Sequence, residues 1–273
     1  MNYKKIIRNY ITIAIGLFTL SSCQKVIDIN LNSAASAIVI EANVSNQPGP
    51  YTVQLSKTVN FSDANTFPQV TGASVTITDN VGNSDILTET SPGKYITNTL
   101  QGIVGRTYSI TVTAEGKSYQ ASVNMPAPVI IDTLIEHISN GFGGGPGSGE
   151  INRSVIAVYN DPAGIENYYR FIETINGVPV NTFTISSDKL RDGEMMSQRM
   201  RGSRDIKLEI GDSVNIQMQS IDKGVYDYFR TFNQSSGGGM NSSSPANPTS
   251  NISNGALGYF SAYSVTSKTI VIQ

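Results

Sequence analysis

Apolar and polar residues alternate along much of the chain from Ile38 onward, which is the pattern of half-buried β-strands. In the first run, Ile38, Ile40, Ala42 and Val44 fall on one face. Clusters of turn-forming residues separate the runs, so we expect seven short strands within residues 38–125. They are Ile38–Val44, Tyr51–Leu55, Ala73–Ile77, Ile86–Leu87, Tyr95–Ile96, Tyr108–Ala114 and Tyr119–Val123. This pattern predicts a small antiparallel sandwich, immunoglobulin-like or transthyretin-like.

The segment Pro126-Ala127-Pro128 is a stiff break, which we take as a domain boundary. Residues 129–273 are expected to form a second, mostly antiparallel β domain, so the predicted class is all-β. Its expected strands are Val129–Ile138, Ser154–Tyr159, Tyr168–Ile175, Thr182–Ser186, Lys207–Ile210, Val214–Ile221 and Gly258–Val265, with Thr269–Ile272 closing an edge.

One short helix is expected in the second domain, because Val225, Tyr228, Phe229 and Phe232 share one helical face. Gly/Ser-rich loops are expected at 141–149 and 235–254. The first lacks the Gly-Lys-Ser/Thr ending of a phosphate-binding loop, so we interpret it as a connector. The second is long for a structureless loop, and is either mobile or packed against another part of the chain.

The N-terminus has the pattern of a secretory signal: Lys4, Lys5 and Arg8 precede a short apolar run that ends at Leu20. This run is too short to span a membrane. The following sequence, Leu20-Ser21-Ser22-Cys23, resembles the lipobox of bacterial lipoproteins. The resemblance implies that residues 1–22 are removed, that Cys23 is lipidated and acylated, and that residues 23–37 form a tether. An ordinary signal peptide or uncleaved anchor with an incidental cysteine is the alternative.

The residues after Cys23 bear on location. Gln24 stands where an Asp would retain enterobacterial lipoproteins in the inner membrane, so we expect an outer-membrane anchor. Gln24-Lys25 resembles the start of the polar stretch of surface-exported lipoproteins in Bacteroidota, although Val26-Ile27 departs from it. We therefore expect the protein at the cell surface, and the periplasmic face remains the alternative.

Composition excludes several kinds of chemistry. The chain has one Cys, one His and no Trp, so it cannot form an internal disulfide or a zinc site of Cys and His ligands. A Cys or Ser nucleophile would have only His137 as its imidazole base. With 19 Lys and Arg against 21 Asp and Glu, the charge balance argues against nucleic-acid binding.

Several segments resemble one family, the Bacteroidota outer-membrane lipoproteins that contain domain of unknown function 4249. They are Ile38–Ala42, Pro50–Ser56, Val70–Ile77, Pro92–Tyr95, Gly105–Tyr108, Gly116–Tyr119, Asp161–Gly164, Asn167–Phe171 and Asn254–Ser264. The resemblance implies no activity and no catalytic or binding residue. Genes of this family commonly stand beside a TonB-dependent outer-membrane receptor, so the resemblance implies an accessory lipoprotein of an uptake or export system.

Three motifs have both a chemical and a structural interpretation. His137 would need a positioned nucleophile and acid to act as a base, and no Gly-x-Ser-x-Gly motif occurs, so we expect a half-exposed strand histidine. Asp188–Gly193 places two carboxylates as a calcium loop would, but Lys189 and Arg191 interleave and favour a salt-bridged turn. Met195, Met196 and Met200 suit Cu(I) or a packed core.

Further side chains are candidates for recognition. Arg199, Arg201 and Arg204 would repel a metal and would suit an anion or lipid head groups, although a solvated basic loop is the main expectation. Tyrosines enrich the second domain and can stack on sugars, but they more often fill a core. They are Tyr168, Tyr169, Tyr226, Tyr228, Tyr259 and Tyr263. Asp132-Thr133-Leu134 and Asp212-Ser213-Val214 match a short acceptor pattern for O-glycosylation.

These observations favour a protein without enzymatic activity, cofactor or metal. The leading hypothesis is a lipid-anchored accessory or binding subunit of a TonB-dependent transport system, which binds the receptor, a glycan or a peptide. An independent structural, adhesive or glycan-binding surface protein is the first alternative. An enzyme that uses carboxylates alone, such as a glycosidase, is the second.

Overall fold

Fifteen strands and one helix form the part of the chain that the computed structural model describes, residues 36–59, 66–140, 151–200, 202, 206–236 and 247–273. The all-β class expected from the sequence is confirmed, because antiparallel sheets make up nearly all of the regular structure. The signal segment, Cys23, the loop at 141–149, and Arg201 and Arg204 lie outside the described residues.

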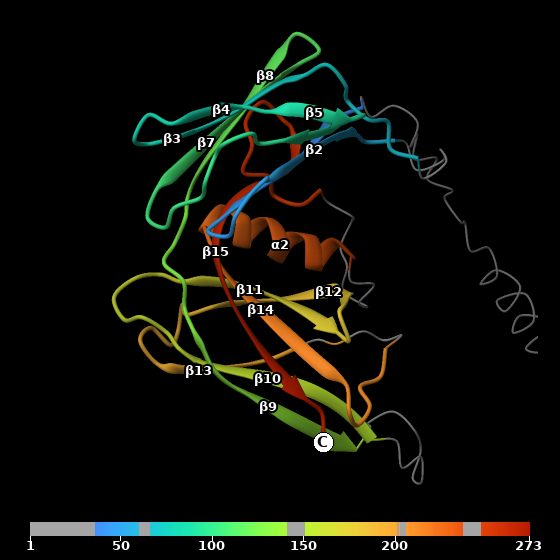
Figure 1. The fold of residues 1–273 in the computed structure, drawn as a ribbon, viewed down its shortest axis with the longest axis vertical. Helices are drawn as coiled ribbons and strands as arrows, with labels where there is room; N and C mark the ends of the chain where they lie inside the picture. The colour runs from blue at the N-terminus through green and yellow to red at the C-terminus, as the bar shows by residue number, and fades with distance from the viewer. Residues whose placement is uncertain (1–35, 60–65, 141–150, 201, 203–205, 237–246) are drawn as a thin grey trace, which may run out of the picture. The chain divides into compact units, whose positions relative to one another are not determined.

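The first eight strands form an antiparallel sandwich (Figure 1). Strands β4, β3, β7 and β8 make one sheet, and β1, β2, β6 and β5 lie in the facing one. Their bounds are β1 Ile38–Ser45, β2 Thr52–Lys57, β3 Ser74–Asp79, β4 Ser84–Ile86, β5 Thr88–Ser91, β6 Lys94–Ile96, β7 Thr107–Ala114 and β8 Lys117–Asn124. Each strand expected from alternation in this part of the chain is present.

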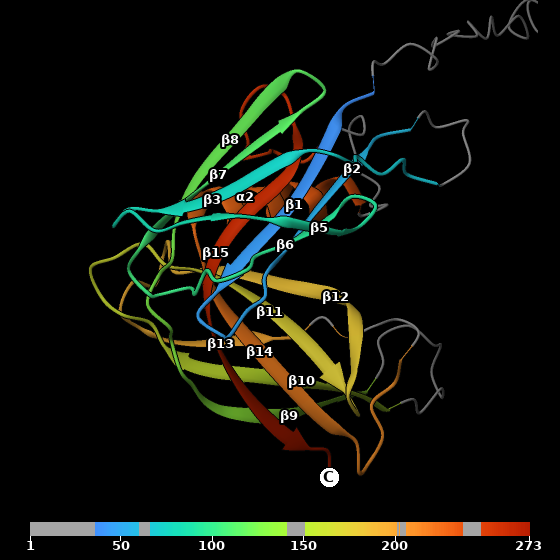
Figure 2. The same ribbon diagram turned by 45° about the horizontal axis from the view of Figure 1, so that its top comes forward.

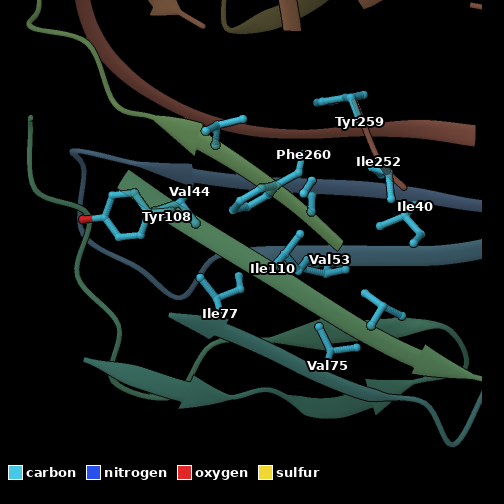
Figure 3. Packing of buried hydrophobic residues seen from close by; sticks show 14 of the residues in the cluster. Ile40, Val44, Val53, Val75, Ile77, Tyr108, Ile110, Ile252, Tyr259 and Phe260 are labelled. Atoms are coloured by element: carbon cyan, nitrogen blue, oxygen red, sulfur yellow. The ribbon is translucent and has the colours of Figure 1, made fainter. Parts of the chain in front are cut away.

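Alternating side chains fill the space between these two sheets (Figure 3). Val75, Ile77 and Ile110 from one sheet meet Ile40 and Val53 from the other, and all are 0–1% exposed. Complete burial of each such side chain stabilises the fold by roughly 1.5–3 kcal/mol. The period-two pattern is thus explained by a single buried face on each strand.

The remaining strands and the helix follow. Strands β13, β10 and β9 form a three-stranded sheet, while β12, β11, β14 and β15 belong to the large sheet. The helix α2 lies against β11, β12 and β15 (Figures 1 and 2). The bounds are β9 Ile131–Asn140, β10 Ile151–Asn160, β11 Tyr168–Ile175, β12 Val178–Ser187, β13 Met195–Arg199, β14 Ser213–Ile221, α2 Lys223–Ser236 and β15 Leu257–Val271.

Strand β15 joins the two halves of the chain. It pairs antiparallel with β14 on one side and parallel with β1 on the other, which gives an eight-stranded sheet in the order β12-β11-β14-β15-β1-β2-β6-β5. Phe260 and Ala262 of β15 therefore belong to the same core as Ile40. A division of the chain at 126–128 crosses this continuous sheet.

The close approach of β15 to β1 depends on Gly258. This residue has φ +91°, and a Cβ atom placed there would lie 2.1 Å from the carbonyl oxygen of Ile40. A side chain would therefore meet both a disfavoured backbone conformation and the backbone of the neighbouring strand.

Three local expectations were wrong. Lys207–Ile210 is not a strand: Asp212 accepts a hydrogen bond from the Glu209 amide at 2.8 Å, and Gly211 has φ +94°, so a turn forms here. Arg199, expected in a solvated basic loop, is instead the last residue of strand β13, which pairs with β10. Thr269–Ile272 is not a separate edge element, because β15 continues to Val271 and pairs with β14.

The loop expected at 235–254 is partly helix. Ser235 and Ser236 are the last residues of α2, and residues 237–246 lie outside the described residues. The described remainder packs against β8: the Ser253 amide donates to the Gln120 carbonyl at 2.8 Å, and Ile252 is 7% exposed. Of the two expectations for this loop, packing holds for residues 250–254.

Gly258→Ala is expected to destabilise the protein by about 3 kcal/mol or more, because it combines a strained φ with a backbone clash. Gly255→Ala is the matched control. Gly255 has φ +73° but no atom within 4 Å of an added Cβ, so only the conformational cost of about 1 kcal/mol is expected. Urea unfolding followed by circular dichroism measures both. Equal losses in the two variants would contradict the proposed role of the β1–β15 contact.

Candidate functional site

Strand β11 lies between β12 and β14 and exposes two chemically different faces. Tyr169, Phe171 and Glu173 point into the core shared with β9, β10 and β13. Tyr168 and Arg170 point to the opposite face, where α2 lies. This division follows from the alternation of side chains along a strand.

Arg170 is enclosed by aromatic rings from three elements. The centre of its guanidinium group lies 4.1 Å from the ring centroid of Phe229 on α2 and 5.2 Å from that of Phe183 on β12. The Phe229 ring is 4.9 Å from Tyr259 of β15, centroid to centroid. Cations within about 6 Å of a ring face are attracted by its quadrupole, so these rings stabilise the positive charge.

Two glutamine side chains of β14 continue the site along the sheet. Arg170 Nη1 donates to Gln219 Oε1 at 3.5 Å, and Gln219 Nε2 donates to Gln217 Oε1 at 2.9 Å. A guanidinium group can only donate, so the Gln219 oxygen must face it and the orientation of both amides is fixed. Within the described residues, the amide nitrogen of Gln217 at the end of this row has no acceptor.

The charge of Arg170 is not balanced by an acid. Across the described residues, no carboxylate lies within 4.0 Å of its guanidinium group, and its buried Nε has no hydrogen-bond partner. Burial lowers the pKa of Arg170, an effect that the neighbouring Tyr259 and Tyr263 oppose. Burial of the Tyr228 hydroxyl raises its pKa to about 12. The site therefore contains a cation with unused donors and neutral hydroxyl groups.

Three carboxylates meet in the loops at one end of β11. Single oxygen atoms of Asp161, Asp188 and Asp192 all lie within 4.8 Å of one another. Each carboxylate also accepts hydrogen bonds from the opposite loop or the adjacent strand: Gly193 N and Tyr169 Oη donate to Asp161, Asn167 N to Asp188, and Gly164 N to Asp192. These bonds join loop 161–167 to loop 188–194.

This arrangement corrects the expected salt-bridged turn. Residues 188–194 do form a turn, but in the described part of the chain neither Lys189 nor Arg191 forms an ion pair with a carboxylate. Burial, and then the charges of Asp161 and Asp192, raise the pKa of Asp188, although the hydrogen bond from Asn167 lowers it. The three aspartates offer the hard oxygen ligands that Ca²⁺ prefers.

The other candidate residues are not brought together. His137 is half-buried on β9 opposite Ser154, and among the described residues its imidazole has no hydrogen-bond partner. Met196 and Met200 are buried in the core at 1% and 4% exposure, whereas Met195 is 69% exposed on the other face of β13. The structure thus separates the thioethers that a copper site would need to combine.

The tyrosines divide between core and surface. Tyr169, Tyr228 and Tyr259 are buried, and Tyr168, Tyr226 and Tyr263 are half-buried. The hydroxyl-bearing residues of the two glycosylation motifs, Thr133 and Ser213, are both exposed. Arg170 lies within the family segment Asn167–Phe171, but it was not among the candidate residues predicted from the sequence. The available signal was a charged residue in a strand whose neighbours are aromatic.

A shallow groove of about 580 Å³ lies on the outer face of the first sandwich. It is formed where residues 250–253 pack beside β7 and β8; none of its lining residues is charged, and polar and apolar atoms line it about equally. The polar lining residues are Ser109, Thr111, Gln120, Ser122, Ser250, Asn251 and Ser253.

Comparison with protein families matches residues 24–269 to the family described as Domain of unknown function (DUF4249). This range covers nearly all of the chain. The protein belongs to this family. No curated protein matches the DUF4249 chain described here.

Among solved structures, this DUF4249 protein is similar to a segment of two fibronectin type III domains from chicken tenascin. The sequences are 12% identical, the match covers 87% of this chain and 99% of that chain, and the TM-score is 0.23. In the described residues of the DUF4249 protein, no helix is long and apolar enough to cross a membrane.

Asp188→Asn is expected to stabilise the protein at neutral pH in the presence of EDTA. Because the folded-state pKa of Asp188 is raised, its contribution is favourable below its usual pKa near 3.8 and is lost as the pH rises. The amide can still accept the hydrogen bond from Asn167. Thermal unfolding from pH 3.5 to 7.5 should therefore show a gain at neutral pH that vanishes in acid.

Asp85→Asn is the control of opposite sign. Burial acts to raise the pKa of Asp85, but hydrogen bonds from Thr99, Leu100 and Asn98 outweigh it and lower the pKa. This substitution should destabilise the protein at neutral pH, and the loss should shrink as the pH falls.

Calcium provides a separate test of the three aspartates. A melting temperature that rises with CaCl₂ in the wild type, but not in Asp188→Asn, would show that the acidic loops hold a cation.

Proposed function

We propose that this DUF4249 protein is a lipid-anchored binding protein of the outer membrane, exposed at the cell surface, that acts as a non-enzymatic accessory of a TonB-dependent transport system. The observation that carries the binding role is the site around Arg170. Its side chains are an arginine, neutral tyrosines, phenylalanines and amides, which recognise ligands by hydrogen bonding and stacking.

The anchor is supported by the sequence Leu20-Ser21-Ser22-Cys23. The first described residue is Ser36, and the segment from Cys23 to Ser36, fully extended, spans at most about 45 Å. Lipidation at Cys23 would therefore keep the sandwich and the Arg170 site close to the membrane, within reach of the extracellular loops of a barrel. The transport role itself rests on the family resemblance.

A second candidate function is the binding of a neutral glycan by an independent surface protein. The groove beside β7, β8 and residues 250–253 favours it, because hydroxyl and amide groups line the groove and can exchange hydrogen bonds with sugar hydroxyls.

Cys23→Ser is expected to remove the protein from the membrane fraction, because stable anchoring requires more than one acyl chain and the variant receives none. Fractionation and mass spectrometry of the N-terminal peptide measure this effect. A wild-type protein that starts at Met1, or that carries no lipid on Cys23, would refute the anchor.

The transport role predicts that the wild-type lipoprotein, extracted from outer membranes in mild detergent, brings down a TonB-dependent barrel in stoichiometric amounts. Affinity purification followed by mass spectrometry tests this. An unrelated lipoprotein of the same membrane, carrying the same tag, is the control for chance co-extraction. Recovery of the lipoprotein alone would reject the transport role and favour the glycan-binding alternative, which a glycan array would then test.

A further inference from the structure

We infer that Arg170 is the anchor point for an oxyanion, a carboxylate or phosphate group of a ligand that reaches the α2-covered face of the large sheet. This inference deepens the proposed binding role but does not require the transporter.

The charge of Arg170 has no countercharge within the described residues. A half-buried cation whose Nε atom is shielded from solvent and that has no acidic partner carries a desolvation cost, which nearby dipoles and aromatic rings offset only in part. Elsewhere in the same protein the cost is met by pairing: Arg106 binds Asp79 at 2.6 Å, and Arg153 binds Glu136 at 3.1 Å. Within the described residues, Arg170 has no such acid, so an oxyanion would supply the missing countercharge.

The hydrogen bonds that start at Arg170 run in one direction along the sheet. Arg170 fixes Gln219, and Gln219 fixes Gln217, so that the free amide of Gln217 is a donor. Arg170 Nε also has no partner. Within the described residues the guanidinium group of Arg170 therefore keeps an unused donor, and charge-assisted hydrogen bonds from guanidinium groups to carboxylates and phosphates are strong.

Arg170, Gln217 and Tyr263 are each only half-buried, so the edge of the site remains open to solvent beside α2. Phe229 of α2 and Phe183 of β12 contact the guanidinium group, and these contacts restrict its orientation before a ligand arrives. Restricting a donor in advance reduces the entropy lost on binding.

Glu41 provides an internal test of the charge argument. It lies exposed on β1, and its negative charge contributes to the raised pKa of Tyr228, which contacts Tyr259 in the same aromatic cluster. An oxyanion bound at Arg170 should be repelled by Glu41, so Glu41→Gln should bind it more tightly.

The experiment is ¹⁵N NMR of the arginine Nε–H groups in the full, lipidated protein in non-ionic detergent, with sodium phosphate, sodium acetate or sodium chloride added at equal ionic strength. We expect the Arg170 signal to shift saturably with phosphate, acetate or both, and not with chloride. The stronger of the two identifies the group. The signal of Arg153, which is already paired with Glu136, should stay in place.

Arg170→Lys keeps the charge but loses the planar donors, and should weaken binding at least about tenfold. Because the Nε–H signal is lost in this variant, the shift of the melting temperature with the same anions measures its binding. An Arg170 signal that fails to saturate, or that responds equally to chloride, would overturn the inference. Arg170 would then have only a structural role, in packing against α2. That result would leave the expected co-purification of a barrel unaffected, so the oxyanion site and the transport role can be rejected independently.

Discussion

The backbone contact between Gly258 and Ile40 determines how the rest of the structure is assembled. Because no side chain separates the strands at this point, β15 can pair with β1 as well as with β14, and one sheet runs through both halves of the chain. The helix α2 packs against that sheet, and the sheet carries both Arg170 and Tyr259 of the aromatic cluster. The proposed site around Arg170 is therefore built from strands that are far apart in the sequence, and its geometry depends on their register.

Local elements were predictable where one physical signal dominated. Alternation located β1, β7 and β8, and the shared face of Val225, Tyr228 and Phe229 located α2, because each buries one side only. The same signal misled at 207–210, where alternating apolar residues precede a turn fixed by Asp212. Strand β13 was not predicted from alternation. Its arginine and the exposed Met195 gave no indication that Met196 is buried.

The candidate sites were less predictable, because they depend on pairings between distant strands. The loop 188–193 was recognised as acidic, but its third carboxylate comes from Asp161, which follows a different strand. Arg170 became a candidate only because Phe183, Phe229 and Gln219 contact it, and these contacts follow from the order of the strands. The residues next to Arg170 in the sequence do not reveal that, among the described residues, its charge lacks an acidic partner.

The parallel pairing of β1 with β15 also constrains the order of folding. Asn43 lies opposite Ser261 in the strand register, so β1 emerges from the ribosome long before the strand that covers its second edge. An uncovered strand edge is a template for association with other chains. The second edge of β1 therefore stays uncovered until β15 is synthesised, and over that interval the edge can pair with other chains.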